Sequence, residues 1–172
     1  MSSENRDKMN NAQKPILVLG VGNNLQTDDG VGVHAVTELM KMEWPQEVEL
    51  VDGGIAGLDL IAIVDGREYV IVLDAVDAGH APGTIFKFTP EDISDTVKHY
   101  DSLHQIGLLE TIQMAKLTGS APRHTLILGV QPEIVDWGLE LTTTIQDCLP
   151  RLISLAKEEI NNAMENYGKY SQ

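Results

Sequence analysis

Short, continuously apolar segments that end in glycine or aspartate are the feature that most constrains the fold of this chain. Residues 16–21 (Ile-Leu-Val-Leu-Gly-Val) lead into a glycine loop, and residues 69–73 (Tyr-Val-Ile-Val-Leu) lead into Asp74. Residues 125–130 form a third run of the same kind. Apolar runs of this length are typical of strands that are buried on both faces, as in a parallel sheet.

Between and after these apolar runs, the sequence predicts helices and two weaker strands. Apolar residues at helical spacing predict a helix after the glycine loop and a last helix from about residue 145 to 167, in which Pro150 should cause a kink or mark a fresh start. Ser102 and Gln105 form a capping box that predicts a helix to about residue 117. Further elements are predicted at 48–51 (strand), 58–64 (short helix) and 84–88 (edge strand).

Alternation of strands and helices predicts an α/β fold with three layers, αβα, around a central, mostly parallel twisted sheet of about five strands. We expect a mobile extension at residues 1–14, a single domain at 15–167 and a C-terminal tail at 168–172. In such folds the active crevice lies beyond the C-terminal ends of the strands. Asp52 and Asp74 follow the second and third strands, so both should lie there.

Charge and composition exclude several classes of function. The chain has 172 residues, a formal net charge of −14 and 42% hydrophobic residues, which suits one folded domain. Nucleic-acid-binding proteins normally present a basic surface, so we expect no nucleic-acid partner. No apolar run is long enough to span a membrane, and residues 1–14 lack the apolar segment of a signal peptide. We therefore expect a cytoplasmic protein without a membrane partner.

The segment LGVGNNLQTDDGVGVHA, residues 19–35, combines two glycine-rich elements with two adjacent aspartates. It partly matches the dinucleotide fingerprint G-x-G-x-x-G/A, but Asp28 and Asp29 at the start of a helix would repel a pyrophosphate. The Walker pattern is absent. The paired carboxylates favour a cation, and the glycines permit a tight turn from strand to helix.

Candidates for binding a cation are Asp28 or Asp29, Asp74 and His104. Each also has an ordinary explanation, as a helix cap, a turn residue or a surface histidine. Asp74 is the strongest candidate, because a carboxylate at the end of a buried strand needs a partner. His104 in the first turn of a helix would stay neutral, as a metal ligand must. The sequence alone does not bring these residues together.

Several segments together resemble the hydrogenase maturation endopeptidases, which process the large subunit of nickel–iron hydrogenases. The matching segments, in the family's order and spacing, are ILVLGVGNNLQTDDGVGVHAVTEL, VDGGIAGLDLI, VIVLDAV, APGTIFKF, SLHQIGLLE, LILGVQPE and LTTTIQDCLPRLI. The resemblance extends from about residue 14 to about residue 160. It implies that Asp29, Asp74 and His104 contact a metal, and that Asp52 is important for activity without touching the metal.

The resemblance also implies a single cleavage, which removes the C-terminal extension of the nickel-loaded precursor of the large subunit. Nickel would be supplied by the substrate rather than bound permanently, although other divalent cations could occupy the site. The chain contains neither an H-E-x-x-H zinc motif nor a G-x-S-x-G nucleophile elbow, and its single cysteine, Cys148, lies in an apolar helical stripe. The expected enzyme is a monomeric, metal-dependent endopeptidase of the aspartic or metallo type.

Three alternatives remain open at this stage. The chain could be a different peptidase on a similar fold, such as a self-activating protease of the spore type. It could instead be a non-catalytic, nickel-binding chaperone of the large subunit, since the same ligands would serve both roles. A nucleotide-binding regulator is the third alternative, and the two aspartates argue against it.

Overall fold

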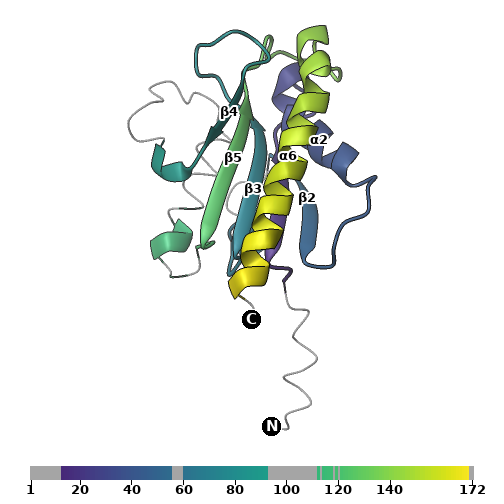
Figure 1. Ribbon diagram of the computed structural model, residues 1–172. Helices are drawn as coiled ribbons and strands as arrows, with labels where there is room; N and C mark the ends of the chain where they lie inside the picture. Colours follow the sequence, from purple (N-terminus) through teal and green to yellow (C-terminus); the bar gives the residue numbers. More distant parts are fainter. Residues whose placement is uncertain are drawn as a thin grey trace.

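Five strands form one sheet in the computed structural model (Figure 1), which describes residues 13–55, 60–92, 112, 114–117, 119 and 121–170. The strand order is β2-β1-β3-β5-β4. The strands are β1 (Ile16–Val21), β2 (Val48–Gly54), β3 (Tyr69–Ala75), β4 (Ile85–Phe88) and β5 (His124–Val130). All neighbouring strands are parallel except β4, which pairs antiparallel with β5 at the edge. The predicted mostly parallel sheet is confirmed.

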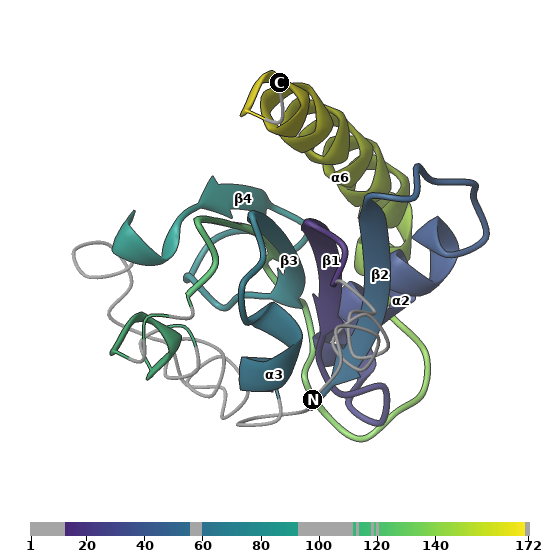
Figure 2. The same ribbon diagram turned by 90° about the horizontal axis from the view of Figure 1, so that it is seen from below.

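Helices cover both faces of the sheet, as Figure 2 shows. On one face lie α2 (Val31–Leu39) and α6 (Thr143–Tyr170), and α3 (Leu60–Val64) lies on the other. The apolar side chains of β1 alternate between these two layers: Ile16 and Val18 face α2 and α6, whereas Leu17 and Leu19 face α3. Because both faces are covered, the central strands are apolar on both sides. The three-layer prediction is therefore confirmed.

Element boundaries differ from the prediction by a few residues. β3 extends through Asp74 to Ala75, because both residues continue the parallel pairing with β5. The predicted strand at 48–51 likewise continues to Gly54. Most of the predicted helix at 102–117 lies outside the described residues. Within that range the structure describes residues 112 and 114–117, and all of them are helical.

The last helix passes through Pro150 as one element, so the fresh start that we considered does not occur. An apolar stripe including Ile145, Leu152, Ala156 and Ile160 is buried against the sheet, and this packing outweighs the backbone hydrogen bond that proline cannot donate. The helix ends at Tyr170 and so includes residues 168–170, which we had assigned to the tail. In the described part of the chain, no helix is long and apolar enough to cross a membrane.

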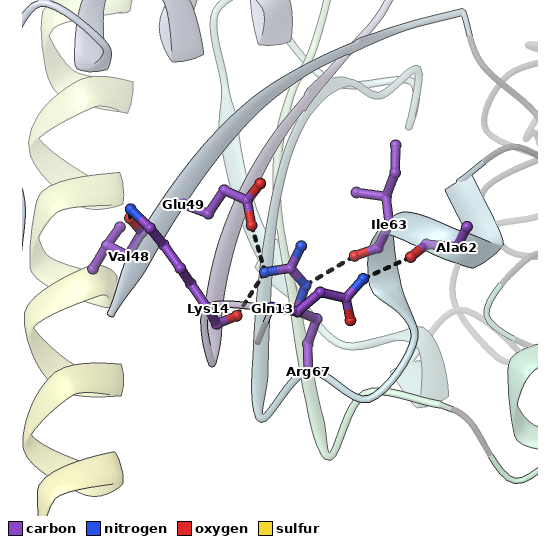
Figure 3. A network of polar contacts seen from close by, with 7 residues as sticks. All are labelled: Gln13, Lys14, Val48, Glu49, Ala62, Ile63 and Arg67. Carbon is purple, nitrogen blue, oxygen red and sulfur yellow. Dashed lines mark hydrogen bonds and ion pairs between the residues drawn. The ribbon is translucent and has the colours of Figure 1, made fainter. Parts of the chain in front are cut away.

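A buried arginine connects the segment just before β1 to α3 and to β2 (Figure 3). Arg67 donates to the carbonyl of Ile63, the carbonyl of Lys14 and the Glu49 carboxylate, and only 4% of its surface is exposed. Gln13 contributes by donating to the carbonyl of Ala62. This cluster lines a pocket of about 590 Å³ at the N-terminal ends of the strands, away from the aspartates predicted to form the site.

Candidate functional site

The glycine loop begins with a turn that only glycine can make. Gly22 follows β1 with φ of +137°, and a Cβ there would lie 1.9 Å from the carbonyl oxygen of Asp29. Its N–H donates to the carbonyl of Gly54 at the end of β2. Gly22 therefore brings the backbone of Asp29 against the ends of two adjacent strands.

Asp29 lies at the C-terminal edge of the sheet, in the 3-10 turn η1 (Thr27–Gly30). Its carboxylate Oδ2 accepts a hydrogen bond of 2.9 Å from the backbone N–H of Asn23, and only 3% of the residue is exposed. The Asn23 side chain in turn accepts from the N–H of Leu25. The N–H of Asn23 therefore orients the Asp29 carboxylate.

The second glycine element serves close packing between the helix and the sheet. A Cβ on Gly32 would lie 2.0 Å from the carbonyl oxygen of Leu73 and 2.4 Å from that of Val21. The first turn of α2 thus rests directly on the ends of β1 and β3. This contact supports our interpretation that these glycines belong to the start of the helix.

Asp74 lies close to the C-terminal end of β3, and 2% of its surface is exposed. It pairs across the sheet with Gly129 of β5. By the alternation along the strand, its side chain shares the face of Val70 and Val72, which pack in the layer of α3. The turn η1, which carries Asp29, packs against β3. The structure therefore places two buried acidic residues at the same edge of the sheet.

Asp52 lies at the end of the outer strand β2 and is exposed. Its Oδ1 accepts a hydrogen bond of 2.9 Å from the N–H of Gly54, whose carbonyl accepts from Gly22. Asp52 thus supports the backbone that positions Asp29. This placement agrees with an indirect role, although its importance for activity remains a prediction.

Asp28 has a structural role that the sequence analysis missed. Its fully buried carboxylate accepts four hydrogen bonds, from the backbone N–H groups of Glu133, Ile134 and Thr142 and from the Thr142 hydroxyl. It does not cap a helix, since neither η1 nor α2 has a side-chain cap. Asp28 instead holds the loop between β5 and α6 against the glycine loop.

Gln131 is a second residue that sequence reasoning missed. It is 6% exposed and follows β5; its side chain accepts from the N–H groups of Ala78 and His80 and donates to Asp77. It therefore orders the loop that follows Asp74. An amide directly after a buried strand was the available signal, but nothing in the sequence identified its partners.

His104 lies outside the described residues, so the structure does not place the third predicted metal ligand. Among the residues that it does describe, no group of three or more His, Cys, Asp or Glu side chains could hold a metal ion. The part of the site that the structure describes thus consists of two buried acidic residues, Asp29 and Asp74, and of the exposed Asp52 at the end of β2. The contribution of His104 remains a prediction.

Cys148 is not a suitable nucleophile. It lies on α6 and packs against the apolar cluster shared with α2. Burial, together with the negative charge of Asp28, raises the pKa of the Cys148 thiol above its ordinary value. The thiol therefore stays protonated at neutral pH, and only the thiolate is strongly nucleophilic. This supports the interpretation of Cys148 as a core residue.

Comparison with known proteins gives a consistent result. The sequence profile of the hydrogenase maturation protease family matches residues 33–159, which is more than half of the chain. The hydrogenase expression/formation protein HupD of Bradyrhizobium diazoefficiens is 39% identical over 144 residues, covering 82% of this chain and 75% of its own length. The hydrogenase 2 maturation protease of Escherichia coli is 35% identical over 155 residues, covering 89% and 92% respectively.

Solved structures agree with the sequence comparison. The hydrogenase maturating endopeptidase HybD from Escherichia coli superimposes with a TM-score of 0.81 at 32% identity, covering 86% of this chain and 93% of that one. A hydrogenase 2 maturation peptidase from a Thaumarchaeota archaeon has a TM-score of 0.66 at 33% identity, and the match covers 86% of this chain and 98% of that one. The resemblance therefore extends over most of the fold.

Proposed function

Since this chain belongs to the hydrogenase maturation protease family, we propose that it removes the C-terminal extension from the nickel-loaded precursor of a nickel–iron hydrogenase large subunit. The observation that carries the proposal is the burial of Asp29 and Asp74 at one edge of the sheet. Carboxylates are suitable ligands for divalent metal ions, and a metal ion carried by the substrate could contact both of these residues.

In this proposal Asp29, Asp74 and His104 contact the nickel of the substrate. Neutral imidazole and carboxylate groups are suitable metal ligands, and three of them leave positions open for the substrate's own ligands. Docking on the metal would fix the peptide bond to be cleaved at the edge of the sheet. A precursor without nickel would bind less well and escape cleavage.

The reaction adds one water molecule across the peptide bond, giving a new C-terminal carboxylate and a free amine. Two roles for the side chains are compatible with the geometry. One carboxylate could accept the proton of the attacking water as a general base, or both could act only by holding the metal. The half-buried Cys148 thiol, whose pKa is raised, supports direct attack by water rather than by cysteine.

The test uses purified precursor with and without nickel and follows its mass over time. Wild-type protein should shorten only the loaded precursor, at one site near its C-terminus. Equal cleavage rates with and without nickel would contradict the metal-dependent recognition. Loaded precursor that binds but is never shortened would favour the non-catalytic chaperone that we considered from the sequence.

Substitutions then test the residues. Asp29→Asn, Asp74→Asn and His104→Ala should each reduce the cleavage rate by at least a hundredfold, because each removes a group that contacts the metal. Asp147→Asn, which changes an exposed aspartate on α6, is the matched control and should cleave like wild type. Circular dichroism should show that all four variants fold. Full activity in any of the first three would remove that residue from the site.

A further inference from the structure

The loop between β5 and α6 presents an unusual group of exposed apolar side chains. Five large apolar residues that are more than half exposed gather here: Leu25, Ile134, Val135, Trp137 and Leu139. Trp137 is 78% exposed. Exposed apolar side chains that occur together, rather than singly, often mark an interaction surface. We call these five residues the apolar platform.

Hydrogen bonds bring the members of the platform together from distant parts of the sequence. Gly138 donates to the carbonyl of Leu25 and accepts from the N–H of Thr27, and Gln26 forms a parallel bridge with Gly138. The Thr27 hydroxyl donates to the carbonyl of Ile134. Figure 2 shows the two segments side by side beyond the ends of β1 and β2. Leu25 and the 134–139 segment therefore form one surface.

Hydrogen bonds hold this surface in place, although it lies on loops. Asp28 accepts backbone hydrogen bonds from Glu133 and Ile134. Thr27 adopts a positive φ of 40°, the only such value for a non-glycine residue in the part of the chain that the structure describes. A buried carboxylate and a strained backbone are costly features, and they persist where the surroundings hold them in place. A surface fixed in advance loses less conformational entropy when a partner binds.

Charge around the platform indicates what kind of partner it fits. Glu133, Asp136 and Glu140 are exposed within or beside it. No lysine or arginine occurs at residues 15–40 or 125–150, the two stretches from which the platform is built. A partner with apolar side chains flanked by lysine or arginine would match both the apolar and the acidic parts. An arginine could also stack on the exposed indole of Trp137.

The platform is continuous with the candidate site. Asp28, which holds the platform, and Asp29, which belongs to the site, are adjacent residues in η1. We propose that the platform is the docking surface for an apolar segment of the precursor protein that carries basic side chains, a proposal that rests on the proposed function. Docking there orients the precursor so that its metal meets Asp29. The platform residues act in binding and are not catalytic residues.

The test compares the Trp137→Ser/Leu139→Ser double variant with wild type in the cleavage assay. The double variant should raise KM for the loaded precursor by about tenfold or more while kcat changes little, since buried aromatic anchors contribute much of the affinity of an interface. Leu117→Ser changes an 84% exposed leucine outside the platform and should leave both constants unchanged. Glu140→Lys should also raise KM, more at low salt than at high salt.

Three outcomes would overturn the inference, two in the cleavage assay and one in direct binding. One is a folded double variant, with wild-type circular dichroism and melting temperature, whose KM is unchanged. Another is a wild-type dimer that the double substitution dissociates without changing KM, because the platform would then serve a second copy of this chain. If wild type cleaves no precursor, the proposed function fails. Direct binding of loaded precursor to wild type and to the double variant still tests the platform, and equal affinities would overturn it.

Discussion

Asp28 and Thr142 are 114 residues apart in the sequence and are joined by two hydrogen bonds. The backbone N–H of Thr142 donates to Oδ1 of Asp28 at 2.7 Å, and its hydroxyl donates to Oδ2 at 2.9 Å. Thr142 also accepts from the N–H groups of Ile145 and Gln146 in the first turn of α6. One carboxylate therefore links the glycine loop to the start of the longest helix.

Asp28→Ala should lower the free energy of unfolding by about 3 to 5 kcal/mol, because it leaves three backbone N–H groups and one hydroxyl without their shared acceptor. Thr142→Val removes only one of the four hydrogen bonds and should cost about 1 kcal/mol. Urea denaturation of both variants measures the difference. If Asp28→Ala unfolds within about 0.5 kcal/mol of wild type, the network does not contribute to stability as the geometry indicates.

The sequence predicted most of the sheet because its strongest signals are local. The runs at 16–21, 69–73 and 125–130 are apolar enough to identify buried strands without knowledge of the fold. Strand ends were less well predicted, since pairing with a neighbour decides where a strand stops. Asp74 illustrates this: a charged residue suggested the end of β3, but pairing with Gly129 keeps it within the strand.

Roles that depend on distant partners could not be predicted. Asp28 and Asp29 are adjacent and chemically identical, yet one holds a distant loop and the other accepts a hydrogen bond within the glycine loop. Only the fold shows that the acceptor sites of Asp28 are taken by residues more than 100 positions away. Gln131 was missed for the same reason, as its partners are 51 to 54 residues distant.

Gly22→Ala should impair both folding and cleavage. The added Cβ would meet the carbonyl oxygen of Asp29 at 1.9 Å, so the loop that carries the carboxylate must shift. Gly66→Ala is a useful comparison, because Gly66 also has a positive φ, of 67°, but a Cβ there has no neighbour within 4 Å.

We expect Gly66→Ala to cost about 1 kcal/mol from backbone strain alone and to cleave normally. Gly22→Ala should lose more stability than this and most of its cleavage activity. Thermal unfolding and the precursor assay measure the two effects. Equal behaviour of the two variants would show that contact with Asp29 is not what requires glycine at this position.

Alkylation of Cys148 should be slow in the folded protein at neutral pH. Burial and the charge of Asp28 raise the pKa of the thiol above its ordinary value near 9, so little thiolate is present. The rate of alkylation by iodoacetamide should therefore begin to increase at a higher pH in the folded protein than in the urea-unfolded protein. Coincident profiles would contradict the pKa direction.

The same shift predicts a loss of stability at alkaline pH. A thiol whose pKa is raised by folding stabilises the folded state fully below its ordinary pKa, and this contribution is lost as pH rises through the raised value. Cys148→Ala removes the titrating group, so the stability of this variant should fall less than that of wild type above about pH 9. Parallel stability curves for the two proteins would contradict this assignment.

Arg67→Met should destabilise the protein without affecting catalysis. Arg67 is buried at the N-terminal ends of the strands, and its loss would leave the carbonyl of Lys14 and the Glu49 carboxylate without this donor. We expect about 2 to 4 kcal/mol of lost stability in urea denaturation. Lys41→Met removes an exposed ion pair with Glu38 and should cost less than about 0.5 kcal/mol. Because the Arg67 cluster lies at the opposite end of the strands from Asp29 and Asp74, the folded variant should keep its wild-type kcat; a strong fall in kcat would show that the two ends of the sheet are coupled.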